Sequence, residues 1–319
     1  MNSILNSTAK DLTLLVIPGL LVIPILIFFP IASPAHQLLA IFAIYFADAG
    51  HVYSTYCRYQ HKIASSKWEL LAPMLFFFLF FFIWLFFELP HLWAFVIYLT
   101  YAHNLRQIFG ISRWYQKVNS KFDSSYGTFL FYALNILPFV LLHFRSNIQT
   151  NEYPTSDLLI SPNPELLRWG LYLYGVIWLL WLYNQFRCGH MGRRFFSVFL
   201  YPFSLALIYL YCFLVATTVY QLMIPLMVSH GVAYMALIQK SRVVLARKSS
   251  WLPIILLGLL GGFISFSEDY LSEEILAPGV LRYIVVAIPL TMLFTHFFVD
   301  PLIWRSSNPD AHQIYNSKG

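Results

Sequence analysis

Charged residues are scarce in this chain. Only 11% of its 319 residues are Asp, Glu, Lys or Arg, whereas a soluble domain carries about 25%. Hydrophobic residues make up 59% of the sequence and aromatic residues 19%. This composition excludes an ordinary soluble domain. It predicts an all-α, polytopic membrane protein in which residues 1–319 form a single transmembrane domain.

Cysteine is scarce too, and two common cofactor-binding patterns are missing. The three cysteines, Cys57, Cys188 and Cys212, show no C-x-x-C spacing, which argues against an iron–sulfur ligand set and predicts free thiols. The chain also lacks a glycine-rich dinucleotide fingerprint. A redox enzyme of this sequence would therefore use an external electron donor, expected on the cytoplasmic side, or a mechanism that needs none.

What the chain has in abundance is long apolar stretches. A transmembrane helix needs about 20 mostly apolar residues. Ten stretches meet that length approximately, at residues 11–30, 36–57, 69–88, 90–112, 126–144, 166–187, 195–216, 219–239, 251–267 and 280–304. The sequence therefore predicts about ten membrane-spanning helices.

The net charge of +6 indicates how the chain is oriented in the membrane and does not suggest a nucleic-acid partner. The connections after the second, fourth, sixth and eighth stretches each hold three or four basic residues, namely Arg58, Lys62, Lys67; Arg113, Lys117, Lys121; Arg187, Arg193, Arg194; and Lys240, Arg242, Arg247, Lys248. The fifth connection has only Arg145, and the ninth is acidic. The positive-inside rule then places the basic connections and both termini in the cytoplasm.

Four histidines lie inside apolar stretches that run in the same direction. His51, His103, His230 and His296 precede the basic residue that follows their stretch by seven, ten, ten and nine positions. At 1.5 Å per residue, all four are expected roughly 10–15 Å from the cytoplasmic edge. The other six, His36, His61, His91, His143, His190 and His312, fall in connections or at helix ends and are not expected to be ligands.

These four histidines have polar neighbours at helical spacing. Asp48 precedes His51 by three positions, and Asp300 follows His296 by four. Arg106 and Gln107 follow His103, and Tyr234 follows His230 by four. Ionisable groups within a bilayer are costly and usually face a bundle interior, so we expect these side chains to converge on one polar site.

Imidazoles and carboxylates together predict a metal centre near the cytoplasmic leaflet. The predicted ligands are Asp48, His51, His103, His230, His296 and Asp300, with the two aspartates acting either as ligands or as partners that fix the histidine tautomers. Arg106 is expected to neutralise a carboxylate or hold an acidic headgroup. Gln107 and Tyr234 are expected to order a bound water. Iron, one or two ions, is the leading prediction and zinc the alternative.

Histidines on membrane helices near the cytoplasmic face are similar, at the level of broad class, to membrane desaturases, hydroxylases and carotenoid-cleaving dioxygenases. The H-x-x-x-H and H-x-x-H-H boxes of the first two are absent. Widely separated single histidines look more like a four-histidine iron centre of the carotenoid-dioxygenase type. The resemblance implies a non-haem iron oxygenase that acts on a lipophilic substrate.

Other interpretations stay open. A zinc-dependent lipid hydrolase, similar to membrane ceramidase-like enzymes, would need three protein ligands and an open water position. A haem-binding electron carrier, a transporter, or polar side chains that simply hold helices together would also place histidines in the membrane. The basic connections fit either an electron donor or anionic membrane lipids.

Overall fold

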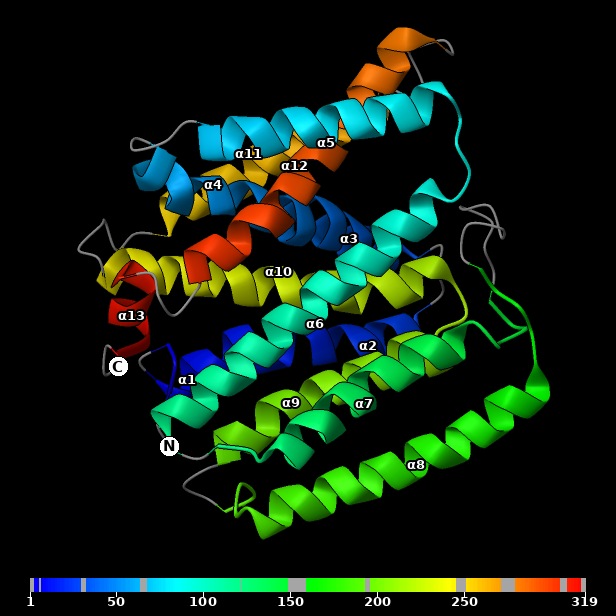
Figure 1. Ribbon diagram of the computed structural model, residues 1–319, viewed down its shortest axis with the longest axis vertical. Coiled ribbons are helices and arrows are strands. Elements are labelled where there is room, and N and C mark those ends of the chain that lie inside the picture. The colour runs from blue at the N-terminus through cyan, green and yellow to red at the C-terminus, as the bar shows by residue number, and fades with distance from the viewer. Residues whose placement is uncertain are drawn as a thin grey trace. The chain divides into compact units, whose positions relative to one another are not determined.

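The computed structural model confirms an all-α membrane bundle (Figure 1). It describes residues 3–5, 7–29, 33–63, 68–120, 122–148, 159–192, 196–244, 251–270, 279–304 and 309–316, and these contain helices but no strand. The elements are α1 (Thr8–Asp11), η1 (Leu12–Val16), α2 (Ile17–Phe28), α3 (Pro34–Ile41), η2 (Phe42–Asp48), α4 (Ala49–Ile63), α5 (Trp68–Phe86), α6 (Leu92–Val118), α7 (Ser125–Leu142), α8 (Pro164–Arg187), α9 (Phe196–Leu210), η4 (Tyr211–Val215), α10 (Val219–Val244), α11 (Leu252–Tyr270), α12 (Val280–Trp304) and α13 (Pro309–Asn316).

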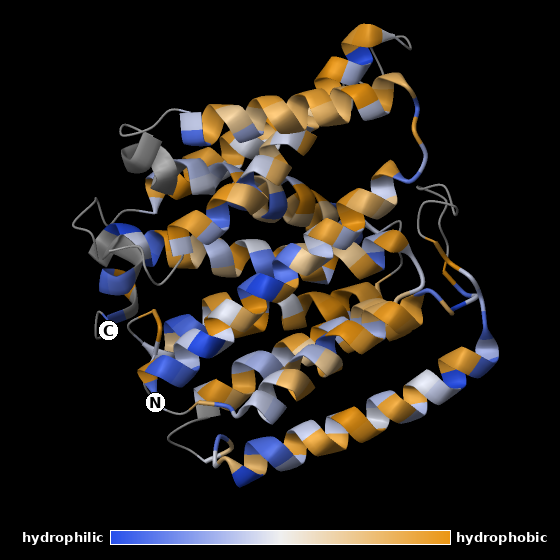
Figure 2. Cartoon of the chain, in the orientation of Figure 1, coloured by the Kyte–Doolittle hydropathy of each residue, from blue (hydrophilic) through white to orange (hydrophobic). Residues whose placement is uncertain are grey.

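All ten expected stretches are helical, and eight are long and apolar enough to cross a membrane. The first two are composite: α1, η1 and α2 form one span, and α3, η2 and most of α4 form the next. The two stretches outside the eight are α6 and α11. Helix α6 is long, but it is hydrophilic in its middle part (Figure 2), and the apolar part of α11 is short, from Leu252 to Ser267.

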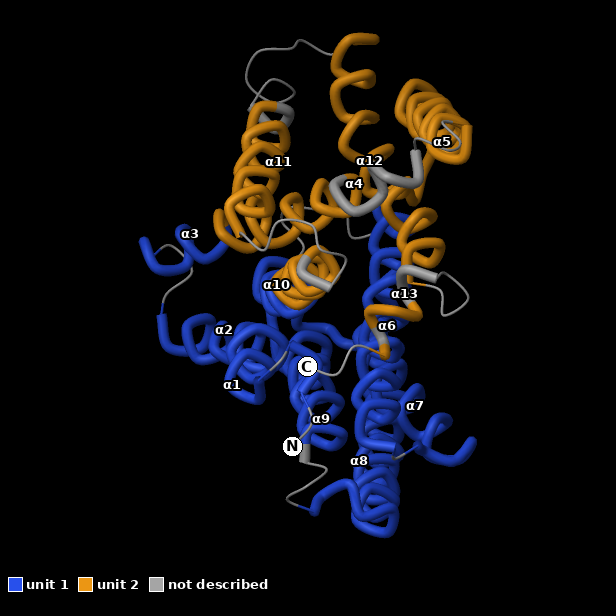
Figure 3. Tube along the Cα trace, turned by 90° about the vertical axis from the view of Figure 1, so that its left-hand side faces the viewer, with its two compact units in different colours: residues 1–40, 93–230, 318–319 blue, residues 41–92, 231–317 orange. Residues whose placement is uncertain are grey.

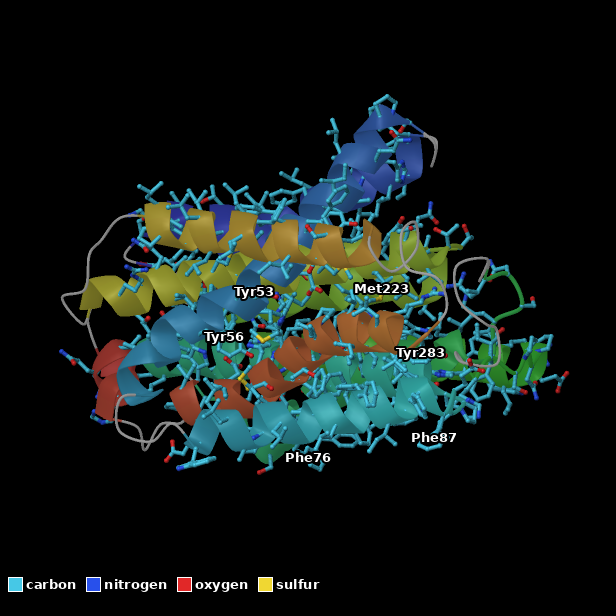
Figure 4. The ribbon with its side chains drawn as sticks, turned by 90° about the horizontal axis from the view of Figure 1, so that it is seen from above. Tyr53, Tyr56, Phe76, Phe87, Met223 and Tyr283 are labelled. Atoms are coloured by element: carbon cyan, nitrogen blue, oxygen red, sulfur yellow. The ribbon has the colours of Figure 1, made fainter. Side chains whose placement is uncertain are left out.

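Helix α5 illustrates how the apolar composition is used. It is hydrophobic along its length (Figure 2), and it packs against α12. Phe81 is fully buried there, with its ring 4.7 Å from that of Phe294. Leu75 and Phe76 are exposed, as suits a helix with one face toward lipid, and Phe76 is labelled in Figure 4.

The segment η2 is a π-helical turn, in which each backbone N–H bonds to the carbonyl five residues back. In η2 the Ala49 N–H donates to the Ile44 carbonyl, so the turn widens just before His51. Such π-turns are rare and often occur at functional sites. Asp48 is the last residue of this wide turn.

The chain divides into two compact units (Figure 3). The first comprises residues 1–40, 93–230 and 318–319, and within it α7 packs against α8, α9 and η4, while α2 packs against α9. The second comprises residues 41–92 and 231–317, and within it α12 packs against α4 and α5, while α11 packs against α4 and η2. That residues 1–319 act as one domain stays a prediction.

The predicted orientation in the membrane also stays a prediction. Several of the basic residues on which it depends, namely Lys67, Lys121, Arg193, Arg194, Arg247 and Lys248, lie outside the described residues, as do Glu273 and Glu274 of the acidic connection. Arg58, Lys62, Glu268 and Asp269 lie on described helices, but their side chains are outside the described part.

Candidate metal centre

His51 lies on α4, one turn after the π-turn of η2. Its side chain is 1% exposed, and its Nδ1 is 3.2 Å from the carbonyl oxygen of Ala47. A carbonyl oxygen only accepts, so Nδ1 of a neutral imidazole must carry the proton. The lone pair of His51 is therefore on Nε2, the tautomer in which that nitrogen can bind a metal.

His296 lies on α12 beside His51. The two ring centroids are 4.9 Å apart with an interplanar angle of 80°, and His296 is completely buried. Its Nδ1 is 2.7 Å from the hydroxyl oxygen of Thr55, which lies one turn after His51 on α4. Thr55 on α4 thus connects to His296 on α12, which lies 241 positions further along the chain.

A chain of hydrogen bonds continues from Thr55. The Thr55 hydroxyl lies 2.9 Å from the hydroxyl of Tyr234 on α10 and donates to it, and Tyr234 donates to Oδ1 of Asp300 at 2.7 Å. Since the Thr55 proton points toward Tyr234, the Thr55 oxygen can accept from Nδ1 of His296. That arrangement gives His296 the same tautomer as His51, with its lone pair on Nε2.

Asp48 stands at the edge of this group. Its Oδ1 is 3.6 Å from Nδ1 of His51, and its side chain is 28% exposed. The distance is longer than a direct hydrogen bond. Asp48 is thus placed next to the imidazole nitrogen that bonds to Ala47, and on the side away from Nε2.

In the second unit, small residues let the helix backbones approach one another closely. A Cβ on Gly231 of α10 would collide with the carbonyl of Ala47 in η2. A Cβ on Gly262 of α11 would likewise meet the carbonyl of Tyr45. Membrane helices use such small residues for close packing. The contact at Gly231 fixes α10 against the turn that precedes His51.

His230 is the residue immediately before Gly231. Helix α10 is continuous from Val219 to Val244, so His230 keeps its place one turn before Tyr234 on the same helix face. One ring nitrogen each of His51, His230 and His296 forms a group within 4.8 Å of one another, and all three residues are buried. The residues that the structure describes yield this one group with metal-ligand spacing, and it does not include Asp48, His103 or Asp300.

The chemistry of this set fits a transition metal. Three neutral imidazoles in an apolar, buried setting suit iron, copper or zinc, and two of them have Nδ1 held by an oxygen acceptor. Asp300 is connected to His296 through Tyr234 and Thr55, the position of a group that orients a ligand. Tyr234 itself is 1% exposed.

The fourth predicted histidine, His103, lies on α6 in the first unit. Its ring is 5.1 Å from that of His230, in an edge-to-face arrangement. Gln107, one turn further along α6, donates from Nε2 to the His230 carbonyl at 3.2 Å. Arg106 is exposed, so the structure does not bring it to the buried histidines.

Sequence reasoning missed Thr55 and Gly231. Thr55 follows His51 by four positions, so helical spacing alone placed it on the same face as His51. The available signal in the sequence was a hydroxyl group one helical turn from His51. Gly231 directly follows His230, but only the packing of α10 shows that a side chain there would strike η2.

Two of the histidines assigned to connections and helix ends have ordinary structural partners. His143 bonds to the Phe139 carbonyl and the Tyr98 hydroxyl, and exposed His312 lies near Asn316. His36 is 4% exposed, and the side chain of His61 lies outside the described part.

His190 has the most elaborate surroundings of these. It is fully buried, with Nδ1 2.8 Å from Gln185 Oε1 and 3.5 Å from Asp123 Oδ1. Burial raises the pKa of the Asp123 carboxyl, and the nearby His190 opposes that rise. Gln116 also donates to Asp123, at 2.7 Å, which makes this a structural polar cluster at the ends of α6, α7 and α8.

Comparison with protein-family models, curated proteins and solved structures finds no match to this chain.

Proposed function

We propose that this chain is an integral-membrane metalloenzyme that acts on a lipophilic substrate, with iron held by His51, His230 and His296. One observation carries the proposal: three buried histidines from three helices each offer a nitrogen within 4.8 Å of the others. A histidine that merely fills a helix interface needs no such convergence. Histidines with open coordination positions are typical of non-haem iron oxygenases.

A bound iron would supply oxidation of the substrate by O₂, in a reaction of the hydroxylase, desaturase or dioxygenase type. The chain's own residues orient the ligands and keep water away. The exposed fractions of His51, His230 and His296 are 1%, 7% and 0%. Ala47 and Thr55 hold Nδ1 of two of the rings, and the Tyr234 hydroxyl holds its proton toward Asp300.

The surroundings favour a lipophilic substrate. Eight helices are long and apolar enough to cross a membrane, so a substrate dissolved in the lipid would lie beside the helices that carry the histidines. We place the centre near the cytoplasmic leaflet because the sequence positions of the histidines relative to the basic connections support that level. A cytoplasmic electron donor and anionic membrane lipids are the partners expected at those connections.

A zinc-dependent lipid hydrolase is the second candidate, and a specific observation favours it. Three histidines with an open fourth position are also the ligand set of catalytic zinc. Zinc lowers the pKa of a bound water towards about 7, which suits hydrolysis of an amide or ester. Asp300, reached through Tyr234, would then orient the ligands in the same way.

The deciding experiment is the metal content of the purified, detergent-solubilised chain, by elemental mass spectrometry combined with an optical spectrum. About one iron per chain without a Soret band supports the oxygenase, and about one zinc supports the hydrolase. A Soret band would make the chain a haem protein. Failure to bind any metal stoichiometrically, after purification without chelator and after incubation with Fe²⁺ or Zn²⁺, would refute both candidates.

A further inference from the structure

Helix α6 of the first unit has one outward face that changes from apolar to basic along the chain. The exposed or half-buried residues that share this face by helical spacing are Leu99, Ala102, Arg106, Gly110, Arg113 and Lys117. Figure 2 shows the same change, with the first part of α6 mainly orange and its middle blue. Such a surface matches an amphipathic molecule that has hydrocarbon at one end and negative charge at the other.

Arg106 lies near the middle of this 27-residue helix, and its side chain is exposed. Within the described residues it forms no hydrogen bond or ion pair, although the Tyr132 hydroxyl on α7 is near enough to interact with its charge. Neither α6 nor α7 contains an aspartate or a glutamate. An exposed guanidinium halfway along a helix of a membrane bundle is costly unless an anion pairs with it. Arg106 thus calls for an anion that these two helices do not supply.

Gly110 leaves open space beside Arg106. A Cβ added at Gly110 would meet no atom within 4 Å. Arg106 precedes Gly110 by four positions and Arg113 follows it by three, which places them about 6 and 4.5 Å away along the helix axis. Both arginine side chains are long enough to reach a group that lies over Gly110.

Arg113 is held in place on the other side of this space. Its guanidinium lies 5.3 Å from the centroid of the Phe122 ring, and its Nη1 donates to Oε1 of Gln116 at 2.8 Å. Asp123 is near enough to interact with its charge. A guanidinium has five N–H donors, so Arg113 keeps donors for a further acceptor.

A phosphate group fits between two such arginines, because guanidinium forks bind phosphate oxygens bidentately. The apolar end of the face favours a phosphate that carries hydrocarbon. Leu99 is 39% exposed, and the small residue Ala102 is exposed between it and Arg106. Acyl chains that lie there would place the phosphate of a lipid next to Arg106.

We propose that this face of α6 binds an anionic phospholipid, with the phosphate over Gly110 between Arg106 and Arg113 and the hydrocarbon along Leu99 and Ala102. All these residues belong to the first unit, and none of them is a proposed metal ligand. The lipid site is therefore independent of the metal centre. It gives Arg106 a role at the surface of the helix rather than at the buried histidines.

The test measures saturable binding of radiolabelled dioleoylphosphatidylglycerol and dioleoylphosphatidylcholine to the full chain in neutral detergent. The two lipids share their acyl chains and a phosphate, but the choline ammonium cancels the net charge. We expect the anionic lipid to bind about fivefold or more tightly, and this preference to decrease at high salt. Inorganic phosphate at the same concentration should not displace the anionic lipid, because it has no hydrocarbon.

Two variants distinguish this site from a general attraction to basic residues. Arg106→Gln removes one charge-assisted contact and should weaken binding of the anionic lipid by about tenfold. Gly110→Leu keeps every charge but fills the space between the arginines, and it should weaken binding by a similar factor. The open surroundings of Gly110 allow this variant to fold.

The matched controls lie on α8 of the same unit. Arg168→Gln removes an exposed arginine, which pairs there with Glu165 at 3.4 Å. Gly175→Leu changes an exposed glycine at which an added Cβ likewise meets nothing within 4 Å. Each control should change the affinity for the anionic lipid by less than about twofold.

Four results would overturn the inference: no saturable binding of dioleoylphosphatidylglycerol, equally tight binding of dioleoylphosphatidylcholine, displacement by inorganic phosphate at the same concentration, or unchanged affinity in Arg106→Gln and Gly110→Leu. Equal weakening in Arg106→Gln and Arg168→Gln would also overturn it, because the chain would then attract the lipid through its overall charge alone.

Discussion

His51 and His296 in the second unit, and His103 and His230 in the first, form two edge-to-face pairs with ring centroids 4.9 and 5.1 Å apart. Their surroundings differ. The first pair has oxygen acceptors on Nδ1 of both rings, one of which begins a chain that ends at a carboxylate. Around the second pair lie amide side chains with acceptor oxygens and a cavity. The two pairs thus have equal spacing but different polar surroundings.

The difference teaches that proximity of histidines does not by itself define a ligand set. A metal-binding imidazole usually has its second nitrogen fixed by an oxygen acceptor, which sets the tautomer and the ring orientation. His51 and His296 have such partners in Ala47 and Thr55. This criterion supports His51 and His296 in the proposed ligand set. His230 belongs to that set by position, because one of its ring nitrogens lies within 4.8 Å of theirs, and the group does not include His103.

The largest effect is expected at the proposed ligands. His296→Ala should reduce bound metal to below about a tenth of the wild-type content, because a site with two remaining ligands binds weakly. His103→Ala should keep more than about half of it, because the group of converging nitrogens does not include His103. Elemental analysis of the purified variants measures both, with exposed His312→Ala as control. Equal losses in His296→Ala and His103→Ala would mean that all four histidines are ligands.

The next effect tests the oxygen partner of His296. Thr55→Val should keep the metal but weaken its affinity about 10–100-fold, measured by competition with a chelator, because Nδ1 of His296 loses its partner. Ser54→Ala is the matched control: both hydroxyl oxygens are buried on α4 and lie 2.8 and 3.2 Å from the His51 carbonyl oxygen, and Thr55 in addition lies 2.7 Å from Nδ1 of His296. An unchanged affinity in Thr55→Val would remove the support for this ligand assignment.

A smaller effect concerns the helix contact beside the ligands. Gly231→Val should lower the free energy of unfolding by about 1–3 kcal/mol, since the new side chain must push α10 away from Ala47. Thermal unfolding in detergent measures this. Gly175→Val on α8 is the control, because a Cβ there meets nothing within 4 Å, and it should cost less than about 0.5 kcal/mol. Similar melting temperatures for the two variants would contradict the close approach.

The smallest effect is expected at the polar cluster of Asp123 and His190, away from the two histidine pairs. Burial holds the pKa of Asp123 above its ordinary value, so the folded protein binds this proton more tightly than the unfolded chain does. That contribution is complete below about pH 4 and is lost as the pH rises through the raised pKa, with a slope of at most about 1.4 kcal/mol per pH unit. Asp123→Asn removes the titrating group, so its melting temperature should fall less over this range.

Melting curves of wild type and Asp123→Asn across pH 4–8 measure the difference between their slopes. His190 faces Asp123, so His190→Gln in the Asp123→Asn background shows whether its titration contributes. Parallel curves for wild type and Asp123→Asn would mean that Asp123 titrates in the folded protein as it does in the unfolded chain.

The fold was largely predictable because it depends on local composition. Apolar stretches of about 20 residues form membrane helices wherever they occur, and all ten predicted stretches are helical. Helix α6 shows the limit: His103, Arg106 and Gln107 make it too polar for the simple criterion, yet it forms a 27-residue helix. Gln107 and the neighbouring Asn104 line a cavity of the first unit, whereas Arg106 is exposed.

The candidate site was predictable only in part. Counting residues from the basic connections predicts that four histidines lie at one level, since the rise of a helix is constant, and that level stays a prediction. It gave no information on which helix faces which, and so could not separate His51 and His296 from His103.

The helices and their approximate ends follow from the sequence alone, because each depends on neighbours along the chain. Only the tertiary structure decided which side chains meet. The Thr55–Tyr234 bond joins residues 179 positions apart, and the Thr55–His296 bond joins residues 241 apart. Such contacts depend on how closely helices pack, and Gly231 against Ala47 sets that distance through the absence of a single carbon atom.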